Sequence, residues 1–279
     1  MSDLFIHDLA QASGPLDRAS LQTILDDGSQ NAKRALLSQL LGSGSGAANR
    51  LAFREEITEI TDAMWQSIAN GDFNKVHVGM HYTAASGRKY WFADADYFFG
   101  AGDTEQTNHH MVVIEDTIQH TAQHQTTNIT TGGAQSSLIY TSTLPTYQSE
   151  LEADFGASHI KSQKILMSNA TSNGMPSGWS WVAKSSFIMN MCMVFGHYLQ
   201  YNENTGEMFN GGNRVRQLSL FQAMPETIIA RLASTDARQW YWLDDVASSA
   251  NWAHVSYTGY ASYGSASNGY GVRRAFLIG

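Results

Sequence analysis

The chain has 279 residues, of which 43% are apolar and 11% aromatic, so it is long and apolar enough to fold around a sizeable core. Its formal net charge of −8 and its lack of any basic run argue against a nucleic-acid partner. No apolar stretch approaches the roughly 20 residues needed to cross a bilayer, so we expect no membrane insertion.

The first 47 residues differ in composition from the rest. Short apolar segments separated by turn residues run to about residue 41, and Gly42–Gly46 (GSGSG) then has the composition of a flexible linker. The beginning lacks the basic and long apolar regions of a secretory signal peptide. We therefore expect residues 1–47 to form a separate segment of a protein made in a cytoplasm.

Residues 48–71 have the apolar pattern of an amphipathic helix. Five apolar residues recur at spacings of three or four and share one helical face: Phe53, Ile57, Ile60, Met64 and Ile68. Asn49 can cap the start of this helix, and Gly71 can end it. The apolar face either packs on its own domain or forms a short coiled coil between copies of the chain.

Residues 72–279 are typical of a mixed α+β domain rich in loops, because short apolar runs alternate with Gly, Asn and Ser. The predicted strands are Lys75–Tyr82, Lys89–Ala95, Met111–Glu115, Arg214–Phe221, Gln239–Leu243, Trp252–Tyr257 and Val272–Ile278. The predicted helices are Thr146–Phe155, Ala157–Met167 and Ser185–Tyr198.

Ten histidines raise the question of a metal site. His109 and His110 are adjacent, so a strand would direct them to opposite faces, whereas His120 and His124 would share one face of a helix. The residues between the latter pair are Thr-Ala-Gln and lack the glutamate of a zinc protease motif. We expect hydrogen-bonded structural histidines, with no metal and no cofactor.

Support for catalysis is equally limited. The chain has no G-x-S-x-G sequence, and its single cysteine, Cys192, lies among Met and Phe residues, which predicts a buried thiol. Glycosidases need two nearby carboxylates, for which Asp94 with Asp96 and Asp244 with Asp245 are candidates. Such pairs more often form hydrogen bonds in turns and loops. We expect that the protein is not an enzyme.

The C-terminal sequence has a distinctive order of motifs. Trp242-Leu243 is followed by a Ser-, Asn- and Tyr-rich stretch and then by Gly271-Val272-Arg273-Arg274-Ala275-Phe276. This resembles a family of phage virion proteins that end on Trp-Leu-Arg, a variable stretch and Gly-Val-Arg-Pro-Ala-Phe. Upstream segments (GDF, DADYF, GDT, HHMVV and LSLFQAMP) fit the same order, so the resemblance runs from Met64 to Gly279.

Two residues depart from the family pattern. Asp244 stands where the family usually has Arg, and Arg274 stands where it usually has Pro. The pairing near the last strand is therefore expected to differ from that of the family.

The resemblance implies a C-type-lectin-like fold for residues 72–279, similar to that of phage tropism determinants with diversified C-termini. Separately, residues 9–41 are similar to segments that attach phage fibre proteins to a virion. The implied protein is a virion adhesin on a tail or head fibre, bound to other virion proteins through its N-terminus. A symmetric homo-oligomer is expected, with a trimer favoured.

In such a fold the last strand closes the core, which leaves the preceding stretch free to bind a host-surface protein or glycan. Tyr, Ser, Gly and Asn dominate this stretch, as they do in antibody binding loops. Trp252 is expected to anchor the core. The predicted ligand-binding residues are Ser249, Asn251, His254, Ser256, Tyr257, Tyr260, Ser262, Tyr263, Ser265, Asn268 and Tyr270.

Two other functions remain open. The chain could be an inert structural or decoration protein of the virion, or a hydrolase acting on surface glycans. Calcium-dependent sugar binding is not expected, because the stretch has no carboxylate and the chain has no Glu-Pro-Asn or Gln-Pro-Asp triplet.

Overall fold

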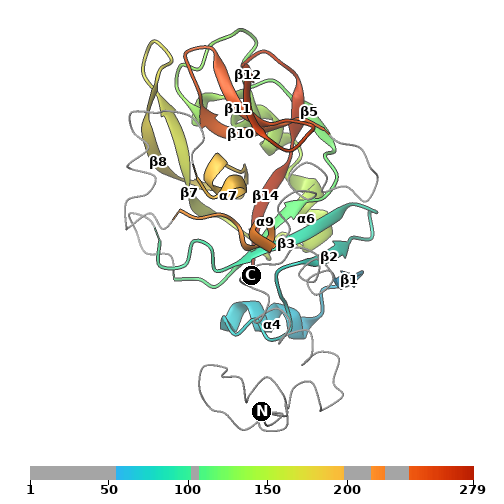
Figure 1. Cartoon of the computed structure of the whole chain (residues 1–279). Coiled ribbons are helices and arrows are strands. Elements are labelled where there is room, and N and C mark those ends of the chain that lie inside the picture. Colours follow the sequence, from blue (N-terminus) through green and yellow to red (C-terminus); the bar gives the residue numbers. More distant parts are fainter. Residues whose placement is uncertain (1–54, 102–106, 198–214, 224–238) are drawn as a thin grey trace, which may run out of the picture. The chain divides into compact units, whose positions relative to one another are not determined.

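The computed structural model describes residues 55–101, 107–197, 215–223 and 239–279. They belong to one compact unit, Glu55–Gly279, in which sheets predominate over short helices (Figure 1). The predicted mixed α+β class is confirmed for this unit. The predicted attachment segment and linker, residues 1–47, lie outside the described residues, as do Asn49 and Phe53.

The helix predicted for residues 48–71 is confirmed only in its C-terminal part. Helix α4 spans Asp62–Asn70, with the Thr61 side chain capping its start and Gly71, at φ 70°, ending it. The prediction was wrong for Glu55–Ile57, which form strand β1 and pair in parallel with β2 (Met80–Thr83). β1 forms backbone hydrogen bonds with β2, and the spacing of apolar residues in the sequence could not reveal this pairing.

The larger sheet has the order β1-β2-β3-β4-β14-β6, and β9 also pairs with β14. Its further strands are β3 (Lys89–Ala95), β4 (Met111–Glu115), β6 (Ile160–Lys161), β9 (Ser186–Ile188) and β14 (Arg274–Ile278). The predicted ranges of β3 and β4 are confirmed. Every residue of β4 and β14 is buried, so these two strands form the centre of the sheet.

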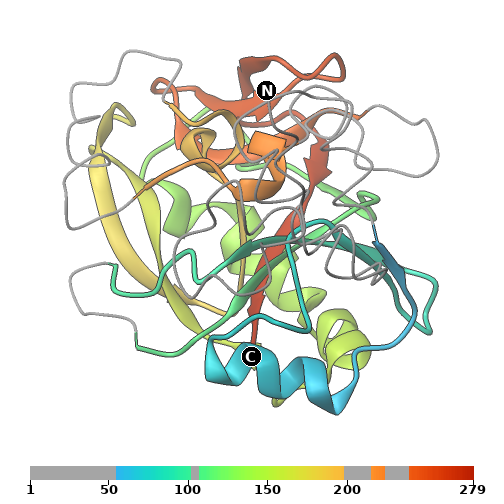
Figure 2. The ribbon, with the colours of Figure 1, turned by 60° about the horizontal axis from the view of Figure 1, so that its bottom comes forward.

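Alternate residues of this sheet pack into two different apolar clusters. Val112 and Leu277 belong to one cluster, whereas Val113 and Phe276 belong to the other together with residues of α4 and α6 (Gln148–Phe155). Figure 2 shows α4 beside the C-terminal end of β14, where a Cβ on Gly279 would lie 3.7 Å from Ile68 Cγ2. Both faces of the sheet are thus covered.

The second sheet has five strands in the order β12-β11-β10-β13-β5 (Figure 1, upper part). They are β5 (His120–Ala122), β10 (Tyr241–Val246), β11 (Asn251–Val255), β12 (Ala261–Ser265) and β13 (Tyr270–Val272). Only Arg273 separates β13 from β14, so the predicted strand Val272–Ile278 is divided between the two sheets. The last core strand therefore anchors the end of the second sheet directly.

The remaining elements are a hairpin of β7 (Gln163–Ala170) and β8 (Pro176–Lys184) and several short helices. The helices are η2 (Ala134–Ser136), η3 (Ile139–Thr143), α5 (Leu144–Thr146), α7 (Met191–Phe195) and α9 (Ser219–Ala223). None of the described helices is long and apolar enough to span a membrane.

Three element predictions are corrected. The helix predicted at Ala157–Met167 is wrong, because β6 and β7 occupy most of it and pair with β14 and β8. The strand predicted at Arg214–Phe221 is wrong where described, since Ser219 begins α9. Of the helix predicted at Ser185–Tyr198, only Met191–Phe195 is helical, while β9 forms a strand. The predicted helix Thr146–Phe155 is confirmed over α6.

Candidate binding surface

The hairpin of β11 and β12 exposes three tyrosines. Tyr257 is 50% exposed, and Tyr260 and Tyr263 are each 60% exposed, which makes them the most exposed large hydrophobic side chains of the described residues. We call these three residues the tyrosine surface. Their predicted exposure is confirmed.

A compact turn holds the tyrosine surface in place. The Gly259 N–H donates to the Ser256 carbonyl at 2.9 Å, and the Ser256 N–H donates to the Tyr260 carbonyl at 2.9 Å. The Ser256 and Thr258 hydroxyls lie 2.7 Å apart. Gly259 has φ 92°, a conformation that a side chain would strain. The two tyrosines of the turn therefore project from a defined backbone.

Trp252 anchors the hairpin in the core, as predicted. This side chain is fully buried and stacks on the His124 ring, with centroids 3.9 Å apart and planes inclined by 4°. Burial lowers the pKa of His124 well below its ordinary value, so the ring packs as a neutral aromatic group. Trp242 meets the same ring edge-on at 4.8 Å.

The structure corrects two of the predicted ligand-binding residues. His254 and Ser256 are only 5% and 2% exposed, so they support the surface from below and offer little area for contact. Desolvation lowers the pKa of His254 to about 4, which keeps its ring neutral at physiological pH. A strand sequence alone did not reveal their burial, because both residue types also occur on surfaces.

The other predicted residues are accessible to different degrees. Ser249 is exposed, while six others are half-buried or exposed along the hairpin and the following loop: Asn251, Ser262, Ser265, Asn268, Tyr270 and Tyr263. Asn251 donates to the Ser248 hydroxyl at 2.9 Å, and the Asn268 amide donates to the Tyr270 hydroxyl at 2.9 Å. These bonds fix the polar rim around the tyrosine surface.

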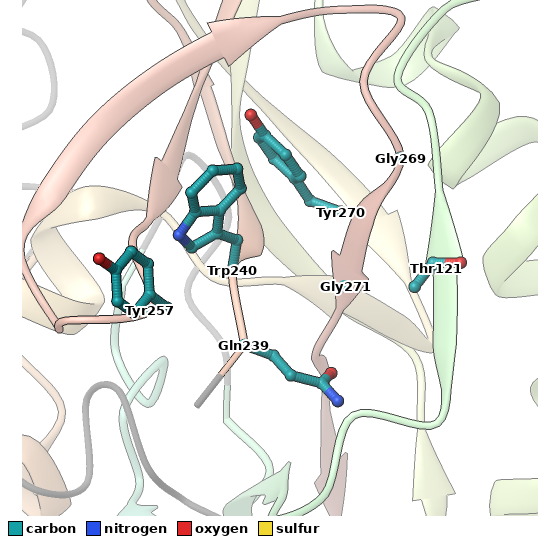
Figure 3. A pocket seen from close by; sticks show the side chains of 7 residues that line it. All are labelled: Thr121, Gln239, Trp240, Tyr257, Gly269, Tyr270 and Gly271. Atoms are coloured by element: carbon teal, nitrogen blue, oxygen red, sulfur yellow. The ribbon is translucent and has the colours of Figure 1, made fainter. Parts of the chain in front are cut away.

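A pocket of about 410 Å³ opens beside the tyrosine surface (Figure 3). Its lining combines two predicted ligand-binding residues, Tyr257 and Tyr270, with five residues that were not predicted: Thr121, Gln239, Trp240, Gly269 and Gly271. We call it the Trp240 pocket. Trp240 lies in the predicted strand Gln239–Leu243, but β10 begins at Tyr241 and leaves Trp240 41% exposed.

Aromatic contacts fix the position of Trp240. The Tyr270 ring meets the indole nearly at right angles, with centroids 4.9 Å apart, and the His254 ring lies at 5.9 Å. Tyr257 lies at 6.0 Å and is inclined by 39°. The indole is therefore held on several sides without being buried.

The carboxylates considered for catalysis are engaged elsewhere. Asp94 pairs with Arg216 and accepts hydrogen bonds from the N–H and hydroxyl of Ser219 at the start of α9. Asp96 bonds the His109 ring at 2.6 Å and the His110 N–H at 2.9 Å. These aspartates hold loops and a helix end in place.

Asp244 and Asp245 are buried within β10. Desolvation raises the pKa of Asp244 well above its ordinary value, and it raises the pKa of Asp245 to about 7. Because neither side chain reaches the surface, the pair cannot flank a glycosidic bond in this structure.

The histidines and the cysteine have structural surroundings. His120 lies on β5, so the alternative of a helix carrying His120 and His124 is wrong. Its Nε2 lies 2.9 Å from a Glu150 carboxylate oxygen. Among the described residues no group of three or more His, Cys, Asp or Glu side chains is placed to hold a metal ion. Cys192 is buried as predicted, and burial raises the pKa of its thiol to about 12.

Comparisons with protein-family models, curated proteins and solved structures find no match to this chain. The chemistry of its own surfaces is therefore the basis for a function.

Proposed function

We propose that the chain is a phage virion adhesin with a C-type-lectin-like fold, which binds a host-surface receptor through the tyrosine surface. The observation that carries this proposal is the exposure of Tyr257, Tyr260 and Tyr263 on a hairpin anchored by buried Trp252. Tyrosine provides large amphipathic contact area at low entropic cost, and a fixed backbone reduces that cost further.

Charge supports a binding role for this region. No residue between Asp245 and Arg273 carries a charged side chain, although the whole chain has 42 Lys, Arg, Asp and Glu residues. Depletion of charge together with enrichment in tyrosine is typical of the centre of protein interfaces. An inert decoration protein would gain nothing from three exposed aromatic side chains on one hairpin.

The proposal includes a location and an assembly. Residues 1–47 attach the chain to other virion proteins, and the remainder presents the tyrosine surface on a homo-oligomer, with a trimer favoured. The hydrolase alternative has less support, because Asp94, Asp96, Asp244 and Asp245 are all occupied by structural contacts.

Adhesion of the labelled full-length chain to cells of the phage host tests the proposal. We expect Tyr260→Ala and Tyr263→Ala each to weaken adhesion by roughly 1 to 3 kcal/mol, the range for aromatic hot spots. Both should leave thermal stability within about 0.5 kcal/mol of the parent chain, as exposed substitutions usually do.

Two further variants make this result specific. Met175→Ala removes a side chain of similar exposure, 48%, at the β7–β8 turn and should leave adhesion unchanged. Phe276→Ala opens a cavity in the fully buried core and should cost roughly 3 to 5 kcal/mol of stability. Full adhesion by a chain that lacks both Tyr260 and Tyr263 side chains would contradict the proposal.

A further inference from the structure

The Trp240 pocket combines a flat aromatic platform with neutral polar groups. Trp240 is 41% exposed, and its neighbour Gln239 directs its amide toward the chain segment near Gly271 (Figure 3). None of the seven residues that line this described part of the surface carries a charge. A volume of about 410 Å³ lies within the roughly 300 to 1,000 Å³ of small-molecule sites.

Two glycines shape this pocket in different ways. A Cβ on Gly271 would lie 2.7 Å from Ile118 Cγ2 and 2.9 Å from the Trp240 carbonyl oxygen, so Gly271 allows close packing of the pocket floor. A Cβ on Gly269 would meet no atom within 4 Å. The space over Gly269 is therefore open, and a larger side chain there would occupy the pocket without displacing the core.

The aromatic geometry distinguishes between two kinds of ligand. A cage for an organic cation needs several ring faces around one space. Here Tyr270 meets Trp240 nearly at right angles at 4.9 Å, and Tyr257 lies 6.0 Å from the indole, inclined by 39°. Both rings therefore contact the indole, and the three rings do not form a box around one space. No carboxylate among the lining residues is present to balance a positive charge.

We propose that the Trp240 pocket binds one uncharged pyranose ring of a glycan. The C–H groups on one face of a pyranose carry a partial positive charge and stack on the electron-rich face of an indole. Its hydroxyl groups can exchange hydrogen bonds with the Gln239 amide, which offers both donors and an acceptor, and with the Tyr257 hydroxyl. The inference that the host receptor is a glycan rests on the proposed adhesin function.

Titration of the full-length chain with small glycosides tests this inference. The probes are the methyl glycosides of glucose, galactose, mannose and N-acetylglucosamine, followed by indole fluorescence and saturation-transfer NMR. We expect at least one of them to bind with a millimolar dissociation constant, as befits a ligand of this size. Methyl glucuronide, glucosamine and choline should bind at least tenfold more weakly.

Two variants assign that binding to the pocket. Gly269→Leu fills the open space and Trp240→Ala removes the platform, so each should weaken glycoside binding at least tenfold. Met175→Ala, which alters an exposed side chain outside both the pocket lining and the tyrosine surface, should leave it unchanged. Thermal unfolding of Gly269→Leu and Trp240→Ala checks that each variant is folded. The inference fails if no neutral glycoside binds, if Gly269→Leu binds as the parent does, or if choline binds best.

Adhesion assays separate this inference from the proposed function. If the chain adheres to host cells while no neutral glycoside binds or competes, the sugar site is wrong and the adhesin stands. If glycosides bind but the chain does not adhere to host cells, the adhesin is wrong and the sugar site stands.

Discussion

Asp244 and Asp245 are consecutive acidic residues on β10 that bond to different neighbours. Oδ2 of Asp244 accepts a hydrogen bond from the Ser168 N–H at 3.2 Å, and Oδ2 of Asp245 accepts one from the Met191 N–H at 2.7 Å. Asp245 is fully buried, and this burial raises its pKa to about 7. The folded chain therefore keeps a proton that an ordinary aspartate loses near pH 4.

This difference predicts a pH dependence of stability that Asp245→Asn should remove. Between the unfolded pKa of 3.8 and the folded pKa of about 7, the folded state binds one more proton than the unfolded state. Stability therefore falls as pH rises through this range, by roughly 1.4 kcal/mol per pH unit. Asparagine has no proton to lose and retains an acceptor for the Met191 N–H.

Urea unfolding at several pH values measures the effect. Relative to the parent chain, Asp245→Asn should gain about 3 to 4 kcal/mol of stability between pH 4 and pH 8. Buried His124 and His254 have lowered pKa values, so they change stability with pH in the direction opposite to Asp245. Both proteins contain these histidines, so their effect cancels when the two stabilities are subtracted. Asp62→Asn removes an exposed charge and serves as the control. A stability difference that does not change with pH would contradict the prediction.

The exposure of single side chains was predictable from the sequence for the three tyrosines but not for Trp240. The tyrosine surface was predicted because Tyr257, Tyr260 and Tyr263 recur in an uncharged stretch. Trp240 was missed because an aromatic residue next to Tyr241 and Trp242 is typical of a core strand. Its exposure depends on where β10 begins, a tertiary feature that composition does not encode.

The first residue of strand β14 is bonded through both its backbone and its side chain. Arg274 donates its backbone N–H to Glu115 Oε2 at 3.0 Å, which a proline at this position could not do. Its guanidinium bonds Glu115 Oε1 at 2.9 Å, Glu150 Oε2 at 2.7 Å and the Tyr147 carbonyl at 2.7 Å. The charge thus links β14 to β4 and to the start of α6.

Arg274→Met should therefore destabilise the chain strongly. Glu115 is only 1% exposed, so loss of its partner leaves a buried charge, at a typical cost of 3 to 5 kcal/mol. Adding Glu115→Gln removes that charge while retaining an acceptor for the residue 274 N–H. We expect the double variant to recover a large part of the loss in urea unfolding.

Lys161→Met provides the control for this experiment, because Lys161 is a half-buried residue whose ammonium bonds only the Ser158 carbonyl, at an exposed position, among the contacts described. It should change stability by no more than about 0.5 kcal/mol. If Arg274→Met costs as little as Lys161→Met, the buried pair does not stabilise the fold.

The secondary structure of a segment was predictable from the sequence where it depends on neighbouring residues and not on distant contacts. The ranges of β3 and β4 were correct because each contains a compact apolar run, residues 90–93 and residues 111–114. Helix α9 was predicted as a strand, and the structure supplies a reason, since Asp94 accepts a hydrogen bond from the Ser219 N–H at 2.7 Å. That cap comes from 125 residues away and leaves no local signal.

At the scale of the whole molecule, the buried central strands and the exposed candidate binding residues lie in different parts of residues 55–279. The central strands β4 and β14 are completely buried, whereas the β11–β12 hairpin presents the tyrosine surface and borders the Trp240 pocket. Loops held by a rigid sheet can vary in sequence without unfolding the domain. This division suits a protein whose ligand contacts lie at one end of a fixed scaffold.

The apolar helical face predicted for residues 48–71 could have joined copies of the chain in a coiled coil. That face is not continuous, because Ile57 lies on β1. The chemistry of the proposed contacts supplies another reason to expect a homo-oligomer. A site that holds one sugar ring binds weakly, and a fibre protein gains adhesion when several copies engage one surface together. Linked sites can raise the overall affinity by roughly 10² to 10⁴ without any new contact. We therefore still expect the full-length chain to be a homo-oligomer, with a trimer favoured.

Light scattering of the full-length chain at micromolar concentration measures this directly, with an expected mass of three times the 30.7 kDa of one chain. Adhesion to host cells should then fall much more steeply on dilution into monomers than binding of a single methyl glycoside, because only adhesion depends on linked sites. Glycoside binding serves as the internal control, since each copy carries a complete Trp240 pocket within residues 121–271. A monomeric mass together with undiminished adhesion would show that one site suffices, and the multivalent mechanism would then be wrong even if the tyrosine surface still binds the receptor.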